Sequence, residues 1–182
     1  MTDDIPTPEF SRPVSVAKLG SRLASYTIEA NEAERAALAE RFELVSLGRL
    51  VAEVALHRDR GDIRVEGKLE ASLVQSCVVT LEPVPEEIDE SFVVLYRPGL
   101  DEDEADRLAL EDPDGDLVEP LAGDAIDIGE AVAQSLSVAM EPYPRAPGVE
   151  LPEIDDGEET EDAAAPEGSR PFDALAGLKR RI

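Results

Sequence analysis

The sequence predicts a single α+β domain in which an antiparallel sheet packs against two main helices. Three observations lead to this prediction. Residues 62–73 alternate between apolar and polar side chains, as in a strand with one buried face. Two segments begin with helix-capping residues and then repeat apolar side chains about once per turn. The hydrophobic content of 42% in 182 residues is enough for one core, which is mainly aliphatic because the chain has no Trp.

The N-terminal third predicts a flexible start, a short strand and a helix. Residues 1–11 are polar and interrupted by prolines, so we expect them to be flexible, with the domain spanning 12–145. A short strand is expected at 14–18, at an edge of the sheet. Asn31 and Glu34 have the spacing of a capping box, which predicts a helix over 32–41.

The central part of the chain predicts a long hairpin followed by another strand. Residues 43–57 carry apolar side chains on both faces, so either both faces are partly buried or Gly48 marks a bulge. A polar turn leads into the alternating strand at 62–75, and together they predict an antiparallel hairpin with one solvated face. A further strand is expected at 87–97. The resulting sheet is either open or partly closed like a barrel.

The last part of the domain predicts an acidic loop and the better of the two helices. Residues 99–124 are dominated by acids and turn residues, so we expect a mobile surface loop. Asp127 and Glu130 form a second capping pattern before apolar residues at every fourth position, which predicts a helix over 128–140. Beyond the domain, 146–170 reads as a disordered acidic linker and 171–182 as a short amphipathic basic tail.

The charge of the chain restricts its partners. The formal net charge is −25 and the sequence pI is about 4.2, which opposes direct binding to a phosphate backbone. The same field would attract basic proteins, although solubility alone also explains such a charge. The acidic, proline-containing start does not resemble a signal peptide, and no apolar stretch is long enough to span a bilayer. We therefore expect a cytoplasmic protein without a membrane partner.

The sequence contains no motif that predicts an active site, a metal or a cofactor. Cys77 is the only cysteine and His57 the only histidine, which excludes an internal disulfide and a metal site built mainly from imidazoles. The acidic stretch at 112–116 does not fit a calcium loop, because its glycine is at the fourth position instead of the sixth. Phosphate-binding and dinucleotide-binding glycine patterns are also absent. We expect a non-catalytic protein without cofactors.

One stretch carries a resemblance to a known family. Residues 74–98 read VQSCVVTLEPVPEEIDESFVVLYRP, a cysteine-containing strand that runs into Leu-Glu-Pro-Val, followed by a strand with a Phe and a closing Pro. This pattern resembles the YceD-like family, and the segments 127–144 and 171–179 are similar to that family's layout. The residues that carry the resemblance are Cys77, Leu81, Glu82, Pro83, Phe92, Pro98 and Phe172. Many members of that family have what resembles a Cys-x-x-Cys pair at this point. This chain has Thr80 where the second cysteine of the pair would be, so a zinc site does not carry over.

The resemblance implies a role in ribosome biogenesis, in the accumulation or processing of large-subunit (23S) ribosomal RNA, without enzyme activity. The expected partners are large-subunit ribosomal proteins or the pre-ribosomal particle, with RNA contacted indirectly. As candidate binding residues we expect the acids of the loop and the bases of the tail: Asp101, Glu102, Asp103, Glu104, Asp112, Asp114, Asp116, Lys179, Arg180 and Arg181.

Two other functions remain open at this point. An acidic chaperone or nucleic-acid mimic would use the display of negative charge itself and no particular motif. A thiol-dependent enzyme would use Cys77 as its nucleophile, although a lone cysteine in a strand-rich segment is more often a small buried side chain.

Overall fold

The computed structural model describes residues 8–111 and 115–149, and these form an α+β domain around one five-stranded sheet. The sheet order is β2-β3-β4-β5-β6, and all neighbours are antiparallel except the parallel pair β5 and β6. The strands are β2 (Ala24–Glu29), β3 (Ser46–Asp59), β4 (Asp62–Ser76), β5 (Pro83–Arg97) and β6 (Leu117–Pro120). The sheet ends in two edge strands, so it is open and not a closed barrel.

The predicted hairpin is confirmed as β3 and β4, the centre of the sheet. Gly48 occupies a β-bulge, because the register between the two strands shifts between Leu47 and Arg49. This bulge explains the apolar side chains on both faces in the sequence of β3. Arg60 and Gly61 both have positive φ in the turn, a backbone conformation that two-residue hairpin loops require.

The two predicted helices are also confirmed. Helix α1 (Glu32–Arg41) has the full capping box between Asn31 and Glu34. Helix α3 (Ile128–Ala139) is capped by Asp127, whose side chain accepts hydrogen bonds from the amides of Gly129 and Glu130. The Glu130 side chain does not return the bond, because it pairs with Arg41 of α1 at 2.8 Å and 2.9 Å instead.

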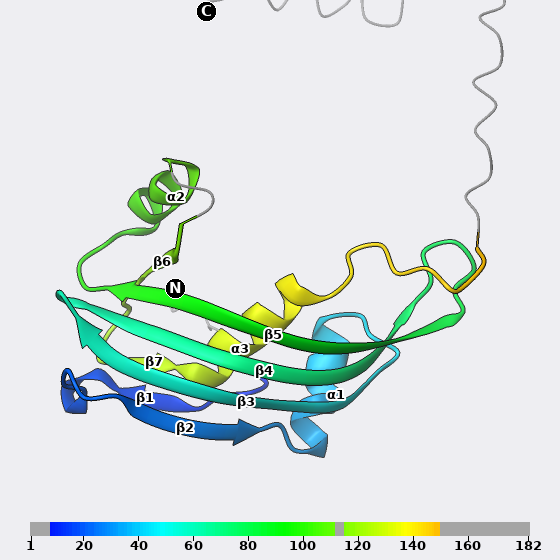
Figure 1. The fold of residues 1–182 in the computed structure, drawn as a ribbon, viewed down its shortest axis with the longest axis horizontal. Helices are drawn as coiled ribbons and strands as arrows, with labels where there is room; N and C mark the ends of the chain where they lie inside the picture. The colour runs from blue at the N-terminus through cyan, green and yellow to red at the C-terminus, as the bar shows by residue number, and fades with distance from the viewer. Residues whose placement is uncertain (1–7, 112–114, 150–182) are drawn as a thin grey trace, which may run out of the picture. The chain divides into compact units, whose positions relative to one another are not determined.

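Both helices cover the same face of the sheet and close an aliphatic core (Figure 1). Leu50, Leu56, Leu69, Val132 and Leu136 are among the fully buried residues. Each such side chain contributes about 1.5 to 3 kcal/mol when it is removed from water. The opposite face of the sheet is solvated and carries cross-strand ion pairs, such as Arg49 with Glu70 at 2.7 Å.

The N-terminal segment crosses the domain and is fixed to α3. Phe10 is fully buried, and the Arg12 amide donates to Asp127 at 2.7 Å. Strand β1 (Pro13–Ser15) then pairs with β7 (Ala125–Asp127) in a small separate sheet. The predicted strand at 14–18 is therefore shorter than expected and does not join the main sheet, since Val16–Lys18 turn into the 3-10 helix η1.

Five elements of the described structure were not predicted: β2, η1, α2 (Glu102–Glu111), β6 and β7. Strand β2 forms the edge of the sheet at residues for which no strand was expected. The segment 99–124, predicted to be a mobile loop, contains helix α2 and strand β6. The prediction of a loop was wrong because the many acidic side chains make the amphipathic pattern of α2 hard to see in the sequence. In the first turn of a helix, acidic side chains stabilise the helix, since they interact favourably with its dipole.

Candidate partner-binding site

Helix α2 begins where the sequence predicted partner-binding acids. The Asp101 side chain accepts a hydrogen bond from the Glu104 amide at 2.8 Å, so Asp101 caps the helix. Glu102, Asp103 and Glu104 form the first turn, in which negative charge interacts favourably with the helix dipole. These four predicted residues therefore lie together on one helix end, and they have a structural role beside any binding role.

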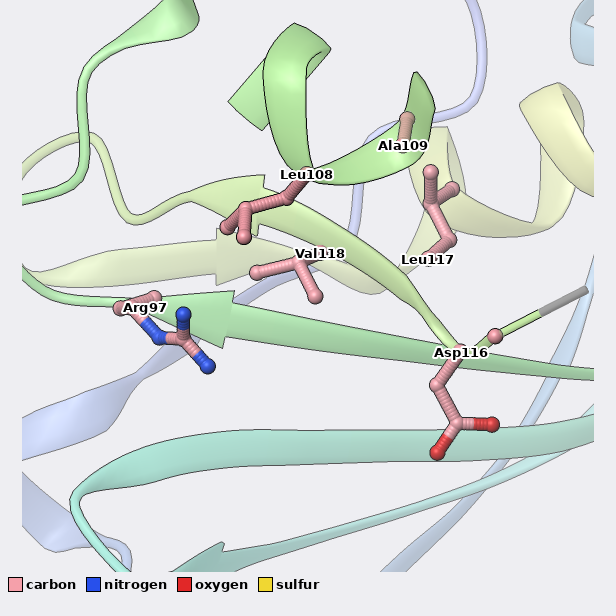
Figure 2. A pocket seen from close by; sticks show the side chains of 7 residues that line it. Arg97, Leu108, Ala109, Asp116, Leu117 and Val118 are labelled. Carbon is pink, nitrogen blue, oxygen red and sulfur yellow. The ribbon is translucent and has the colours of Figure 1, made fainter. Parts of the chain in front are cut away.

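Helix α2 and strand β6 enclose an apolar groove of about 290 Å³. Figure 2 shows Leu108 and Val118 lying close together, with Ala109 and Leu117 beside them and with Arg97 and Asp116 at opposite ends. Both end residues are neutralised, because Arg97 pairs with Asp62 at 2.9 Å and Asp116 pairs with Arg64 at 2.8 Å.

The groove includes one large apolar side chain that is exposed, because Leu117 lines it and is 48% exposed. A groove with exposed apolar lining is a surface at which a partner can bind.

Three carboxylates lie on the two elements that form the groove, Glu102 and Asp106 on α2 and Glu119 on β6, and Glu119 itself lines a neighbouring pocket with Tyr96. Burial raises the pKa of Glu119, and the neighbouring carboxylates of Asp106 and Glu102 raise it further. Within the part of the chain that the structure describes, none of the three forms an ion pair. Burial, followed by the charge of Glu119, also raises the pKa of Tyr96 to about 12. A positive charge placed here would be stabilised.

The one base on α2 neutralises its surroundings only weakly. Arg107 lies 3.6 Å from Glu104 and 3.9 Å from Glu111, and all three side chains are about half exposed or more. Such surface pairs contribute about 0 to 1 kcal/mol. We call the groove together with Glu102, Asp106 and Glu119 the acidic groove. Asp106 and Glu119 were not among the predicted residues, because their proximity depends on how α2 folds onto β6.

The other sequence feature, Cys77, lies in a tight turn at the far end of β4. The Cys77 amide donates to the Glu82 carbonyl at 2.8 Å, and the Leu81 amide donates to the Cys77 carbonyl at 3.0 Å. Leu81 has a φ of 62°, which is uncommon for a leucine, and its side chain is 78% exposed. The residues Cys77, Leu81, Glu82 and Pro83 thus build one compact turn.

The Cys77 thiol is covered by its neighbours and held in hydrogen bonds. The Thr80 amide lies 3.4 Å from Sγ. Hydrogen bonds from the Thr80 side chain and from backbone amides, including that of Ala146, lower the pKa of Cys77 to about 6. Enclosure acts in the opposite direction but is the smaller effect, because only a thin layer of residues covers the sulfur. The lowering comes from hydrogen-bond donors, which stabilise the thiolate.

The remaining predicted residues fall into two groups. Phe92 lies on β5 over Gly67, and Pro98 follows the end of β5. Asp112, Asp114, Phe172, Lys179, Arg180 and Arg181 lie outside the described residues, as do most of the predicted linker and the whole predicted tail. Across residues 8–111 and 115–149, no cluster of His, Cys, Asp and Glu could hold a metal ion, and each helix is too short or too polar to cross a membrane.

The fold and the acidic groove together define the class of the protein as an acidic α+β domain with an apolar groove on its surface. The model of the family described as large ribosomal RNA subunit accumulation protein YceD matches residues 65–179, which is more than half of the chain. The chain belongs to this family. No curated protein and no solved structure matches the chain.

The match begins at Val65, within β4, and covers the three segments that carry the resemblance, 74–98, 127–144 and 171–179. It includes the Cys77 turn, β5, the acidic groove and α3. The family description supports a role related to ribosome biogenesis and an involvement with large-subunit ribosomal RNA.

Proposed function

We propose that this chain is a non-enzymatic ribosome biogenesis factor, and that it acts in the accumulation or processing of large-subunit (23S) ribosomal RNA by binding a basic ribosomal protein or the pre-ribosomal particle. The observation that carries this proposal is the acidic groove, because α2 and β6, which supply its apolar lining, also bring together three carboxylates that form no ion pair among the described residues. A basic protein segment with an apolar side chain would satisfy both features.

Charge favours a protein partner over direct RNA contact. RNA affinity depends on Lys and Arg that replace counterions on the phosphates, and a chain of net charge −25 repels those phosphates. Proteins of the large subunit that bind RNA carry the opposite charge. The long-range field of this chain would accelerate their association and would weaken as salt increases.

The test is a variant in which the acidic groove is neutral. The variant carries Glu102→Gln, Asp106→Asn and Glu119→Gln, which remove charge with little change in shape. A matched control carries Glu29→Gln, Glu40→Gln and Glu53→Gln, which are exposed acids on other elements without ion pairs. Each tagged protein is used to capture components from a bacterial lysate with and without ribonuclease, and large-subunit precursor RNA and ribosomal proteins are quantified.

The proposal expects the groove variant to lose most of the captured large-subunit components and the control to retain them. Capture should survive ribonuclease if the contact is made through protein. Equal losses for both variants would favour the acidic chaperone or nucleic-acid mimic, which depends on total charge. Full retention by the groove variant contradicts the proposed site.

We further propose that Cys77 has no catalytic role. Its thiol is covered by neighbouring residues, and its hydrogen bonds stabilise the turn that leads into β5. A strain that carries Cys77→Ala should accumulate mature large-subunit RNA at the wild-type level. A defect in RNA accumulation, with the variant protein at normal abundance, would favour the thiol-dependent enzyme.

A further inference from the structure

A second surface, separate from the acidic groove, lies along the first part of β5. Strand β6 pairs only with residues Val94–Arg97 of β5. From Pro83 to Val93, β5 has only β4 as a strand neighbour among the described residues, so its other edge presents unpaired backbone groups (Figure 1). Such an edge can accept an added strand.

An apolar groove of about 460 Å³ accompanies this edge. Leu69 is fully buried and forms its floor, and Phe92 lies on one side. Val138 and Ala139 of α3 line the other side, and Val138 is 86% exposed. The side chain of Val138 is therefore mostly in contact with water, although α3 itself covers the core.

Gly67 allows the Phe92 ring of this groove to approach β4 closely. A Cβ at Gly67 would lie 2.6 Å from the Phe92 ring, so a larger residue there would force the ring to move.

The edge is strongly acidic. Glu86, Glu87, Asp89 and Glu90 follow one another on β5, and the strand carries no base before Arg97. Lys68 neutralises Asp89 at 2.8 Å, and Glu86 accepts hydrogen bonds from Gln75 and from the Glu141 amide. In the described residues Glu87 and Glu90 have no ion pair, and Glu90 borders the groove.

We propose that the β5 edge binds an extended, basic segment of a partner protein, which adds to the sheet as a strand. Its backbone would pair with β5, an apolar side chain would contact Val138 and Phe92, and a basic side chain would face Glu90. A second copy of this chain fits poorly, because two such edges would place acids against acids. This proposal does not depend on the acidic groove.

The test uses the full chain labelled for NMR and a blocked peptide of alternating lysine and valine as the probe. One control peptide has the same composition with the lysines grouped first, and another has a proline at its centre, which removes a backbone donor. Amide shift changes on adding the alternating peptide should concentrate at Glu86–Phe92 and at Val138. Both control peptides should bind more weakly.

A pair of variants separates apolar contact from general charge attraction. Val138→Ser should weaken the affinity for the alternating peptide about tenfold, since one aliphatic contact is lost. Val45→Ser, another exposed valine away from this groove, should leave its affinity unchanged. No binding, shift changes spread over all acidic surfaces, or equal binding of the proline peptide would each overturn the proposal, whatever the outcome of the lysate experiment on the acidic groove.

Discussion

Replacing Gly129 with alanine should detach the N-terminal segment from the domain. A Cβ at this position would overlap the Phe10 carbonyl oxygen and would lie 2.9 Å from the Phe10 carbonyl carbon and 3.1 Å from the Arg12 amide nitrogen. These atoms belong to the backbone, so they cannot move aside by a change of rotamer.

Two effects of opposite sign decide the magnitude. Alanine is favoured over glycine in a helix by up to about 1 kcal/mol. Detaching the segment exposes Phe10, at a cost of about 2 to 3 kcal/mol. It also breaks the hydrogen bonds of the Arg12 amide with Asp127 and of the Ile128 amide with the Arg12 carbonyl, each worth about 1 kcal/mol. The clash outweighs the helix propensity, and we expect a net loss of about 3 to 5 kcal/mol.

The assay is urea unfolding followed by circular dichroism, with a thermal scan on the same samples. For a chain of this size the loss corresponds to a fall in Tm of about 6 to 20 °C. Gly20→Ala is the control, because a Cβ there meets no atom closer than 4.0 Å. If Gly129→Ala is as stable as Gly20→Ala, the close approach of the N-terminal segment to α3 is refuted.

Four further predictions concern single interactions. Arg41→Gln removes the bidentate pair with Glu130 and the contact with Glu9 at 3.0 Å; it should destabilise the domain by about 1 kcal/mol at low salt and less at high salt, as urea unfolding can measure. Asp106→Asn should lower the pKa of Glu119, which carboxyl NMR titration can measure. Because this pKa is raised in the folded state, Glu119 opposes folding increasingly as the pH rises through it. An unchanged pKa of Glu119 would exclude the proximity of α2 to β6. Ultraviolet absorbance should show a Cys77 thiolate forming near pH 6 in the folded protein. Since the ordinary pKa of the thiol is 9.0, the stability of the protein relative to Cys77→Ala should rise as the pH increases from about 6 to 9, and this gain should be lost as the pH drops through about 6. Titration of the thiol near pH 9 would contradict the hydrogen bonds at Sγ. Leu56→Ala should cost about 2 to 5 kcal/mol, and a cost below 1 kcal/mol would contradict its full burial.

The sequence predicted the elements whose patterns are long and local. The β3–β4 hairpin was predictable because many alternating residues share one turn, and α1 because its capping box fixes the first residue of the helix. Strand β2 was not predicted because it is short and has only three residues on the inward face of the sheet, Ala24, Tyr26 and Ile28, opposite β3. Strands β1 and β7 are three residues each, too short for any periodicity.

The candidate site was predicted in its charge but not in its shape. The acids at Asp101–Glu104 were visible as a group because of their density in the sequence, and their binding role stays a prediction. The apolar groove was not predictable, because Leu108 and Val118 come together only when α2 packs on β6. The unpaired carboxylates were not predictable either, since an ion pair depends on which base the fold brings within reach.

The pairing of β1 with β7 has a consequence for folding during synthesis. Pro13 of β1 lies opposite Asp127 of β7. Strand β1 is therefore synthesised early but cannot pair until β7, nearly the last element of the domain, has been synthesised. Until α3 emerges, the aliphatic face of the β3–β4 hairpin has only α1 to cover it, and Phe10 has no pocket to fill. Closure of the domain is therefore a late, long-range step, and a fragment that ends before Ala125, which lacks both β7 and α3, should remain unfolded and prone to aggregation.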